Sequence, residues 1–172
     1  MRDKIAAALD LFRCHILFVH RDSDGQNPEW RYNEVRDAIG PLANRSAPLS
    51  YVCVVPIRMT EAWLLVDEVA IRNAAGNPAG EVSLTLPRLQ QIEDIPNPKA
   101  LLRNLLRTAS EMSGRRLKRF HDSQCARRVA DYMRDFDRLR ALSGFRRLEA
   151  DLRHQADLII ARLDRDHGAS AT

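Results

Sequence analysis

Two short apolar runs constrain the fold of this 172-residue chain more than any other feature. Residues 16–19 and 51–55 are rich in β-branched and aromatic side chains, which is typical of fully buried strands. Between them, residues 29–39 have apolar positions at helical spacing, and the pattern ends at a Gly-Pro pair. A strand, a helix and a second strand in this order form a right-handed crossover with parallel strands. We therefore expect an α/β fold.

Helical spacing of apolar residues predicts further helices on both sides of this unit. Their expected ranges are 3–13, 60–75, 98–107, 122–142 and 144–165. Four prolines over residues 77–98 exclude a regular helix there and favour an extended loop. The expected organisation is a small parallel sheet flanked by helices in residues 1–76, a proline-rich loop over 77–98, and a basic helical region packed on the core over 99–172.

Composition favours one compact unit in a reducing compartment. The hydrophobic content of 45% is enough for a sizeable core. None of the three cysteines, Cys14, Cys53 and Cys125, has the spacing of a metal ligand pair. The N-terminus lacks the apolar core of a signal peptide, and no run approaches the ~20 apolar residues needed to cross a bilayer. We expect a cytoplasmic protein without a membrane partner.

The charge is distributed unevenly along the chain. Residues 1–98 hold 10 Lys and Arg against 13 Asp and Glu, whereas residues 99–165 hold 17 against 9. The densest basic cluster consists of Arg115, Arg116, Lys118 and Arg119. Such a cluster suits either a nucleic-acid phosphate backbone or a solvated helix face, and the pattern alone favours neither.

Two carboxylates, Asp22 and Asp24, follow the first apolar run. Alternate residues of a strand point to the same side, so this pair can bind one Mg²⁺ or Mn²⁺, although an Asp-Ser-Asp-Gly sequence also forms ordinary polar turns. Thr60 suits the N-cap of the helix after the second strand, which places Glu61 in its first turn. The ends of parallel strands share one sheet edge, so we expect the three carboxylates to converge there.

A metal held by Asp22, Asp24 and Glu61 would polarise a phosphoryl oxygen and activate an attacking water. The basic cluster over residues 115–119 would neutralise the phosphate backbone, and Arg58 lies at the same expected edge, where it either orients phosphate or pairs with a carboxylate. The sequence contains no Walker loop, Gly-x-Ser-x-Gly elbow or dinucleotide fingerprint, so we expect no ATPase activity of its own.

Several segments resemble an uncharacterised bacterial family related to TOPRIM domains. They are the Asp22-x-Asp24 strand end, the crossover that follows it, residues 55–65 (VPIRMTEAWLL), residues 98–99 (PK), residues 113–116 (SGRR) and residues 143–148 (SGFRRL). TOPRIM domains occur in topoisomerases, primases and nucleases of the overcoming-lysogenization-defect type. The resemblance implies a Mg²⁺ site made by the Asp-x-Asp pair and a glutamate, acting on phosphodiesters. A TOPRIM domain normally begins with a strand that ends in glutamate, and no Glu precedes Asp22, so the pattern lacks that first strand.

Two functions are therefore expected as alternatives. One is a Mg²⁺-dependent nuclease or related phosphodiester-acting protein. The other is a non-catalytic nucleic-acid-binding or regulatory subunit that works beside an ATPase partner. The resemblance to the TOPRIM-related family also implies a phage-defence or mobile-element setting.

Overall fold

A computed structural model describes residues 1–42 and 49–169, with side chains to residue 165. This part of the chain is mixed α/β and mostly helical, with one two-stranded parallel sheet. The helices and strands are α1 (Arg2–Leu11), β1 (Leu17–His20), α2 (Pro28–Ile39), β2 (Tyr51–Val54), α3 (Thr60–Trp63), α4 (Glu68–Ala74), α5 (Pro98–Ala109), α6 (Gly114–Lys118), α7 (Asp122–Tyr132) and α8 (Ser143–Ala169). Short 3-10 helices are η1 (Gly40–Leu42), η2 (Leu64–Val66), η3 (Leu89–Asp94) and η4 (Asp137–Ala141). Residues 170–172, the end of the expected helical region, lie outside the described residues.

The parallel pairing of β1 and β2 confirms the expected crossover through α2. Leu17 lies opposite Tyr51, and the register continues to the C-terminal ends of both strands. The expectation of two fully buried strands is correct for the centre of β2, where Val52 is 0% exposed. It is wrong for β1, because Leu17 and Val19 pack on the core while the alternate residue Phe18 is 53% exposed.

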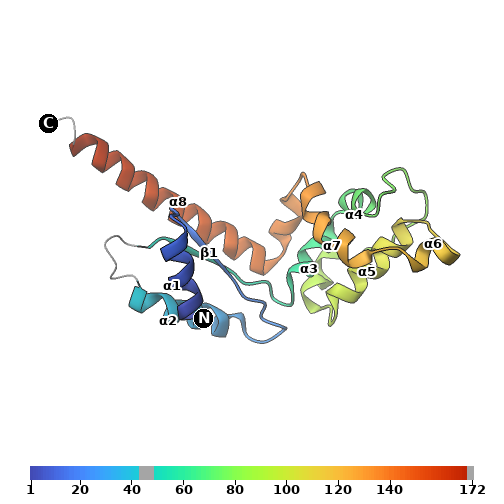
Figure 1. The fold of residues 1–172 in the computed structure, drawn as a ribbon, viewed down its shortest axis with the longest axis horizontal. Helices are drawn as coiled ribbons and strands as arrows, with labels where there is room; N and C mark the ends of the chain where they lie inside the picture. Colours follow the sequence, from blue (N-terminus) through green and yellow to red (C-terminus); the bar gives the residue numbers. More distant parts are fainter. Residues whose placement is uncertain (43–48, 170–172) are drawn as a thin grey trace.

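The hydrophobic core consists of two clusters, which correspond to the two lobes of the elongated molecule in Figure 1. The α/β lobe contains α1, α2 and the sheet, and its buried residues run from Ile5 to Val55. The helical lobe contains α3 to α7, and its buried residues run from Ala62 to Leu142. By core packing, α3 and α4 thus belong with α5 and α7, whereas the sequence pattern places the end of the first unit at residue 76.

Helix α8 connects the two lobes. Near its N-terminus, Phe145 meets the ring of Trp63 in the helical lobe edge to face, with ring centroids 5.5 Å apart. Two residues later, the Arg147 guanidinium lies 3.5 Å from the ring centroid of Tyr32 in the α/β lobe. Figure 1 shows α8 passing behind the sheet and continuing beyond it. Neighbouring residues of one helix therefore contact both cores.

Two expected helices are interrupted in the structure. The helix predicted over 60–75 is divided because Asp67 has an extended backbone, with φ of −123°, and its side chain accepts a hydrogen bond from the Ala70 N–H. The helix predicted over 122–142 ends at Tyr132, because Met133 is also extended, and η4 follows. No helix in the described ranges combines the length and apolar character needed to cross a membrane.

Candidate functional site

The loops that follow β1 and β2 are joined by backbone hydrogen bonds. The N–H groups of Ser23, Asp24 and Gly25 donate to the carbonyl oxygens of Pro56, Arg58 and Ile57, at 3.1, 3.0 and 2.9 Å. The Ser23 side chain is fully buried, and its hydroxyl donates to the Pro56 carbonyl oxygen at 2.9 Å. These bonds fix the loop that carries Asp22 against the segment that leads into α3.

The Asp22 carboxylate contacts the start of α3 directly. Its Oδ1 accepts a hydrogen bond from the Thr60 N–H at 3.2 Å and lies 3.2 Å from His20 Nε2. The same His20 nitrogen lies 2.8 Å from Thr60 Oγ1. Because Glu61 is the next residue of α3, its backbone lies close to this contact at the C-terminal ends of the two strands.

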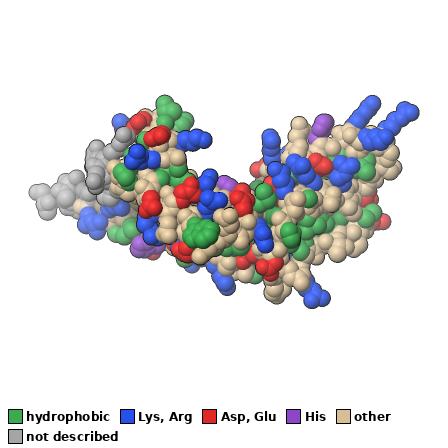
Figure 2. All heavy atoms as spheres, turned by 90° about the horizontal axis from the view of Figure 1, so that it is seen from below, with side chains coloured by type: hydrophobic (Ala, Val, Ile, Leu, Met, Phe, Trp, Pro, Cys, Tyr) green, Lys and Arg blue, Asp and Glu red, His purple; other side chains and the backbone are tan. Residues whose placement is uncertain are grey.

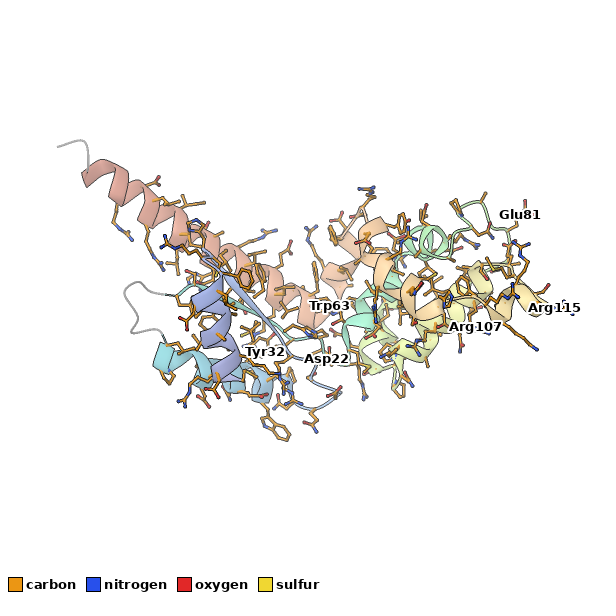
Figure 3. All side chains as sticks on the ribbon, in the orientation of Figure 1. Asp22, Tyr32, Trp63, Glu81, Arg107 and Arg115 are labelled. Carbon is orange, nitrogen blue, oxygen red and sulfur yellow. The ribbon has the colours of Figure 1, made fainter. Side chains whose placement is uncertain are left out.

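Asp22 and Glu61 line a cleft of about 480 Å³. The side formed by the end of β1 and by α3 contributes His20, Asp22, Thr60 and Glu61. The opposite side is formed by α5 and α7 and contributes Lys99, Arg103, Ser123, Ala126, Arg127 and Ala130. Figure 3 shows Asp22 at the middle of the molecule, where the lobes meet. The cleft is therefore lined by acidic side chains from the end of β1 and from α3, and by basic side chains from α5 and α7.

Four charged side chains of this cleft have no ion-pair partner among the described residues. Within the part of the chain whose side chains are described, none of Glu61, Lys99, Arg103 and Arg127 forms an ion pair of 4.0 Å or less. Many other arginines are paired; Arg72, for example, lies 2.6 Å from Glu68. The cleft thus leaves cationic groups available to a bound anion.

Asp24 lies apart from this arrangement. Strand β1 ends at His20 and Asp24 has a positive φ of 54°, so the alternation of a strand does not extend to it. Its side chain is 58% exposed and lies 3.9 Å from the Arg31 guanidinium. Across residues 1–42 and 49–165, no three His, Cys, Asp or Glu side chains form a group that could hold a metal ion. Asp22 and Glu61 line the same cleft, and Asp24 does not.

The basic residues singled out from the sequence lie outside the cleft. Arg115, Arg116, Lys118 and Arg119 are exposed on or beside α6. Figure 3 shows Arg115 at the far end of the helical lobe from Asp22, and Figure 2 shows Lys and Arg side chains projecting at that end. Arg58 packs against Gly25, whose φ is +76°, and a Cβ at that glycine would overlap the guanidinium.

Sequence reasoning missed the three cations of the cleft. Lys99 and Arg103 are four residues apart in a predicted helix, and this spacing indicates that they share one face of α5. Arg127 comes from α7, and its position depends on how α7 packs against α5. Local pattern therefore identifies the first pair, whereas the third cation requires tertiary structure.

A second polar cavity, of about 220 Å³, lies between α2, β2 and α8. Burial raises the pKa of Tyr32 to about 12 and the pKa of Cys53 to about 11. Both side chains are uncharged at neutral pH, so Cys53 is a poor nucleophile there. We therefore interpret the side chains around this cavity as contacts between α8 and the sheet rather than as a catalytic site.

The chain was also compared with known proteins. It matches no protein-family model, and no curated protein or solved structure is significantly similar to it.

Proposed function

We propose that this protein is a Mg²⁺-dependent nuclease, or a related phosphodiester-acting protein, whose site is the cleft between the lobes. One observation supports the proposal most strongly: two carboxylates and three cations line the same cleft. The carboxylates are Asp22 and Glu61, and the cations are Lys99, Arg103 and Arg127. Carboxylates suit a hard divalent cation, and guanidinium and ammonium groups suit phosphate oxygens. The sequence resemblance to a TOPRIM-related family agrees with this chemistry.

The residues of the cleft fit Mg²⁺ better than a cation that needs a full protein cage. Mg²⁺ is usually bound through one or two carboxylates, with waters and substrate phosphates completing its shell. Asp22 and Glu61 would be these carboxylates, and Mn²⁺ would suit them equally. The bound metal would polarise a phosphoryl oxygen and lower the pKa of an attacking water. Thr60 and His20 hold the Asp22 carboxylate in place.

The three cations of the helical lobe would bind and orient the phosphate groups. Arg103 has a buried Nε that makes no hydrogen bond in the described part of the chain. Because charge builds up on phosphoryl oxygens during the reaction, fixed cations across the cleft would stabilise the transition state as well as the substrate. Catalysis would then depend on both lobes.

Cleavage of circular single-stranded DNA and of RNA, with Mg²⁺ or with EDTA, tests this function. We expect cleavage only with the metal, and a loss of about a hundredfold or more in Asp22→Asn and Glu61→Gln. Asp24→Asn is the matched control, because its carboxylate is exposed and lies away from the cleft. An Asp24→Asn protein as inactive as Asp22→Asn, or cleavage that survives both cleft changes, would contradict the proposal.

A second candidate function is a non-catalytic nucleic-acid-binding or regulatory subunit of an ATPase partner. It is favoured by the position of Asp24, which leaves the cleft with two acidic residues where the TOPRIM-like pattern implies three. Metal-independent binding of nucleic acid without cleavage would select this alternative. The ATPase partner and the phage-defence or mobile-element setting stay predictions from the resemblance.

A further inference from the structure

The basic side of the cleft is a surface built by two packed helices. Lys99 and Arg103 lie on α5, and Arg127 lies on α7, which packs directly against α5. Both helices are anchored in the helical core through the buried side chains of Leu102, Leu106 and Val129. Three cations are therefore presented by a rigid support rather than by a loop, which favours their binding a ligand at a fixed place.

The charge state of this surface indicates an anionic ligand. On the next turn of α5, Arg107 pairs with Asp122 at 3.2 Å, whereas Lys99 and Arg103 have no such partner in the described part of the chain. The facing carboxylate of Glu61 also forms no ion pair there. A phosphate group between these two sides would satisfy the cations that the protein itself leaves unpaired.

The size of the cleft limits what can enter it. Its volume of about 480 Å³ lies within the range of about 300–1,000 Å³ that small-molecule sites occupy. A space of this size admits one nucleotide unit but not the two paired strands of a duplex.

Resting on the proposed function, we infer that the cleft binds one nucleotide unit of a single-stranded nucleic acid, with its phosphate held by Lys99, Arg103 and Arg127. The strand would continue over the helical lobe, past Arg107 toward α6, where Figure 3 labels Arg107 and Arg115. The helical lobe would thus determine the selectivity for single strands, and the carboxylate side would act on the phosphodiester presented to it.

Fluorescence anisotropy tests this inference with a fluorescein-labelled oligothymidylate about twelve nucleotides long and an oligouridylate of the same length. The titration is run in EDTA, so that binding is measured even if the protein cleaves nothing and the proposed function fails. We expect saturable binding that a blunt duplex of the same length competes for about tenfold less well. Thymidine monophosphate should compete weakly, because it offers no neighbouring phosphates.

The decisive variant carries Lys99→Gln and Arg127→Gln, both at exposed positions, so the fold should be retained. Its matched control carries Arg134→Gln and Arg138→Gln, which are exposed and lie outside the cleft. We expect the cleft variant to bind about tenfold more weakly, with a salt dependence lowered by about 0.7 per lost phosphate contact, and the control to bind like the native protein. Equal affinity of the two variants, equal competition by duplex or by the mononucleotide, or no binding by the native protein would each overturn the inference.

Discussion

Burial of Cys53 and Tyr32 makes the stability of the α/β lobe depend on pH in the alkaline range. Cys53 is 6% exposed, and its pKa rises from 9.0 to about 11 on folding. The folded state holds this proton more tightly, so the stabilisation is complete below pH 9 and is lost as the pH rises toward 11. We expect a loss on the order of 1–2 kcal/mol from this thiol.

Urea unfolding of native protein and Cys53→Ala at pH 8 to 11 checks this prediction. The variant loses a titrating group, so its free energy of unfolding should change less steeply with pH, whatever its stability at pH 8. Tyr32→Phe should flatten the curve only at higher pH, since the pKa of Tyr32 rises to about 12. Parallel curves for native protein and Cys53→Ala would show that the thiol does not contribute.

At the level of residues, the sequence predicts some neighbours and not others. The meeting of Asp22 and Glu61 follows from parallel strands whose C-terminal ends share an edge. That Asp24 lies outside the cleft cannot be predicted in this way, because it depends on the positive φ that Asp24 adopts in the turn before Gly25. The position of Arg127 depends on packing between helices distant in sequence, which no local pattern encodes.

Among the helices, α8 depends on an acidic cap supplied by a distant segment. The Glu93 carboxylate accepts hydrogen bonds from the N–H groups of Ser143 and Gly144, at 3.1 and 3.0 Å, and from the Ser143 hydroxyl at 2.8 Å. These groups would otherwise lack helical partners, and a negative charge here also favours the helix dipole. The cap fixes where α8 begins, and therefore which of its residues reach each lobe.

Glu93→Ala should lower the free energy of unfolding by about 1–2 kcal/mol, because the first N–H groups of α8 lose their acceptor. The neighbouring Asp94→Ala is the control, since Asp94 is exposed and its side chain forms no hydrogen bond or ion pair within the described residues. Chemical denaturation of the two variants measures the difference. Equal stability of both variants would mean that water replaces the cap without cost.

The helices themselves are well predicted by apolar spacing, and their interruptions are not. The expected helix over 98–107 corresponds to α5, with Pro98 in its first turn and the Asn97 side chain capping the Ala100 N–H. The breaks at Asp67 and Met133 occur within patterns that remain compatible with a helix. Spacing of apolar residues does not register such breaks; the one at Asp67 is accompanied by a local cap, in which the Asp67 side chain accepts a hydrogen bond from the Ala70 N–H.

For the molecule as a whole, α8 holds two separate cores in one arrangement. Arg147 reaches the α/β lobe through the Tyr32 ring and an ion pair with Glu29, while Phe145 reaches the helical lobe. Arg147→Ala should remove about 1–2 kcal/mol from the first contact and leave the second intact. Hydrogen exchange should then quicken in α2 and the sheet and stay unchanged in α5. Equal effects in both lobes would show that the lobes unfold as one unit.

The basic cluster of residues 115–119 lies far from the cleft. It should therefore contribute to the binding of long oligonucleotides but not of short ones. Figure 3 shows Arg115 far from Asp22 along the molecule, so only a long strand can reach both. Changing Arg115, Arg116, Lys118 and Arg119 to Gln should weaken binding of a long oligothymidylate and lower its salt dependence by about 0.7 per contact. Binding of a trinucleotide should be unchanged. A loss that is the same for both lengths would contradict this path.

We propose that Asp22 and Glu61 hold a divalent cation in the cleft that Lys99, Arg103 and Arg127 also line. The most direct measurement is anomalous diffraction from crystals soaked with Mn²⁺ and a 5′-phosphorylated dinucleotide. We expect a manganese peak between the carboxylates of residues 22 and 61, with the phosphate against the three cations. A peak at Asp24 with none beside Glu61, or a dinucleotide bound elsewhere, would contradict it.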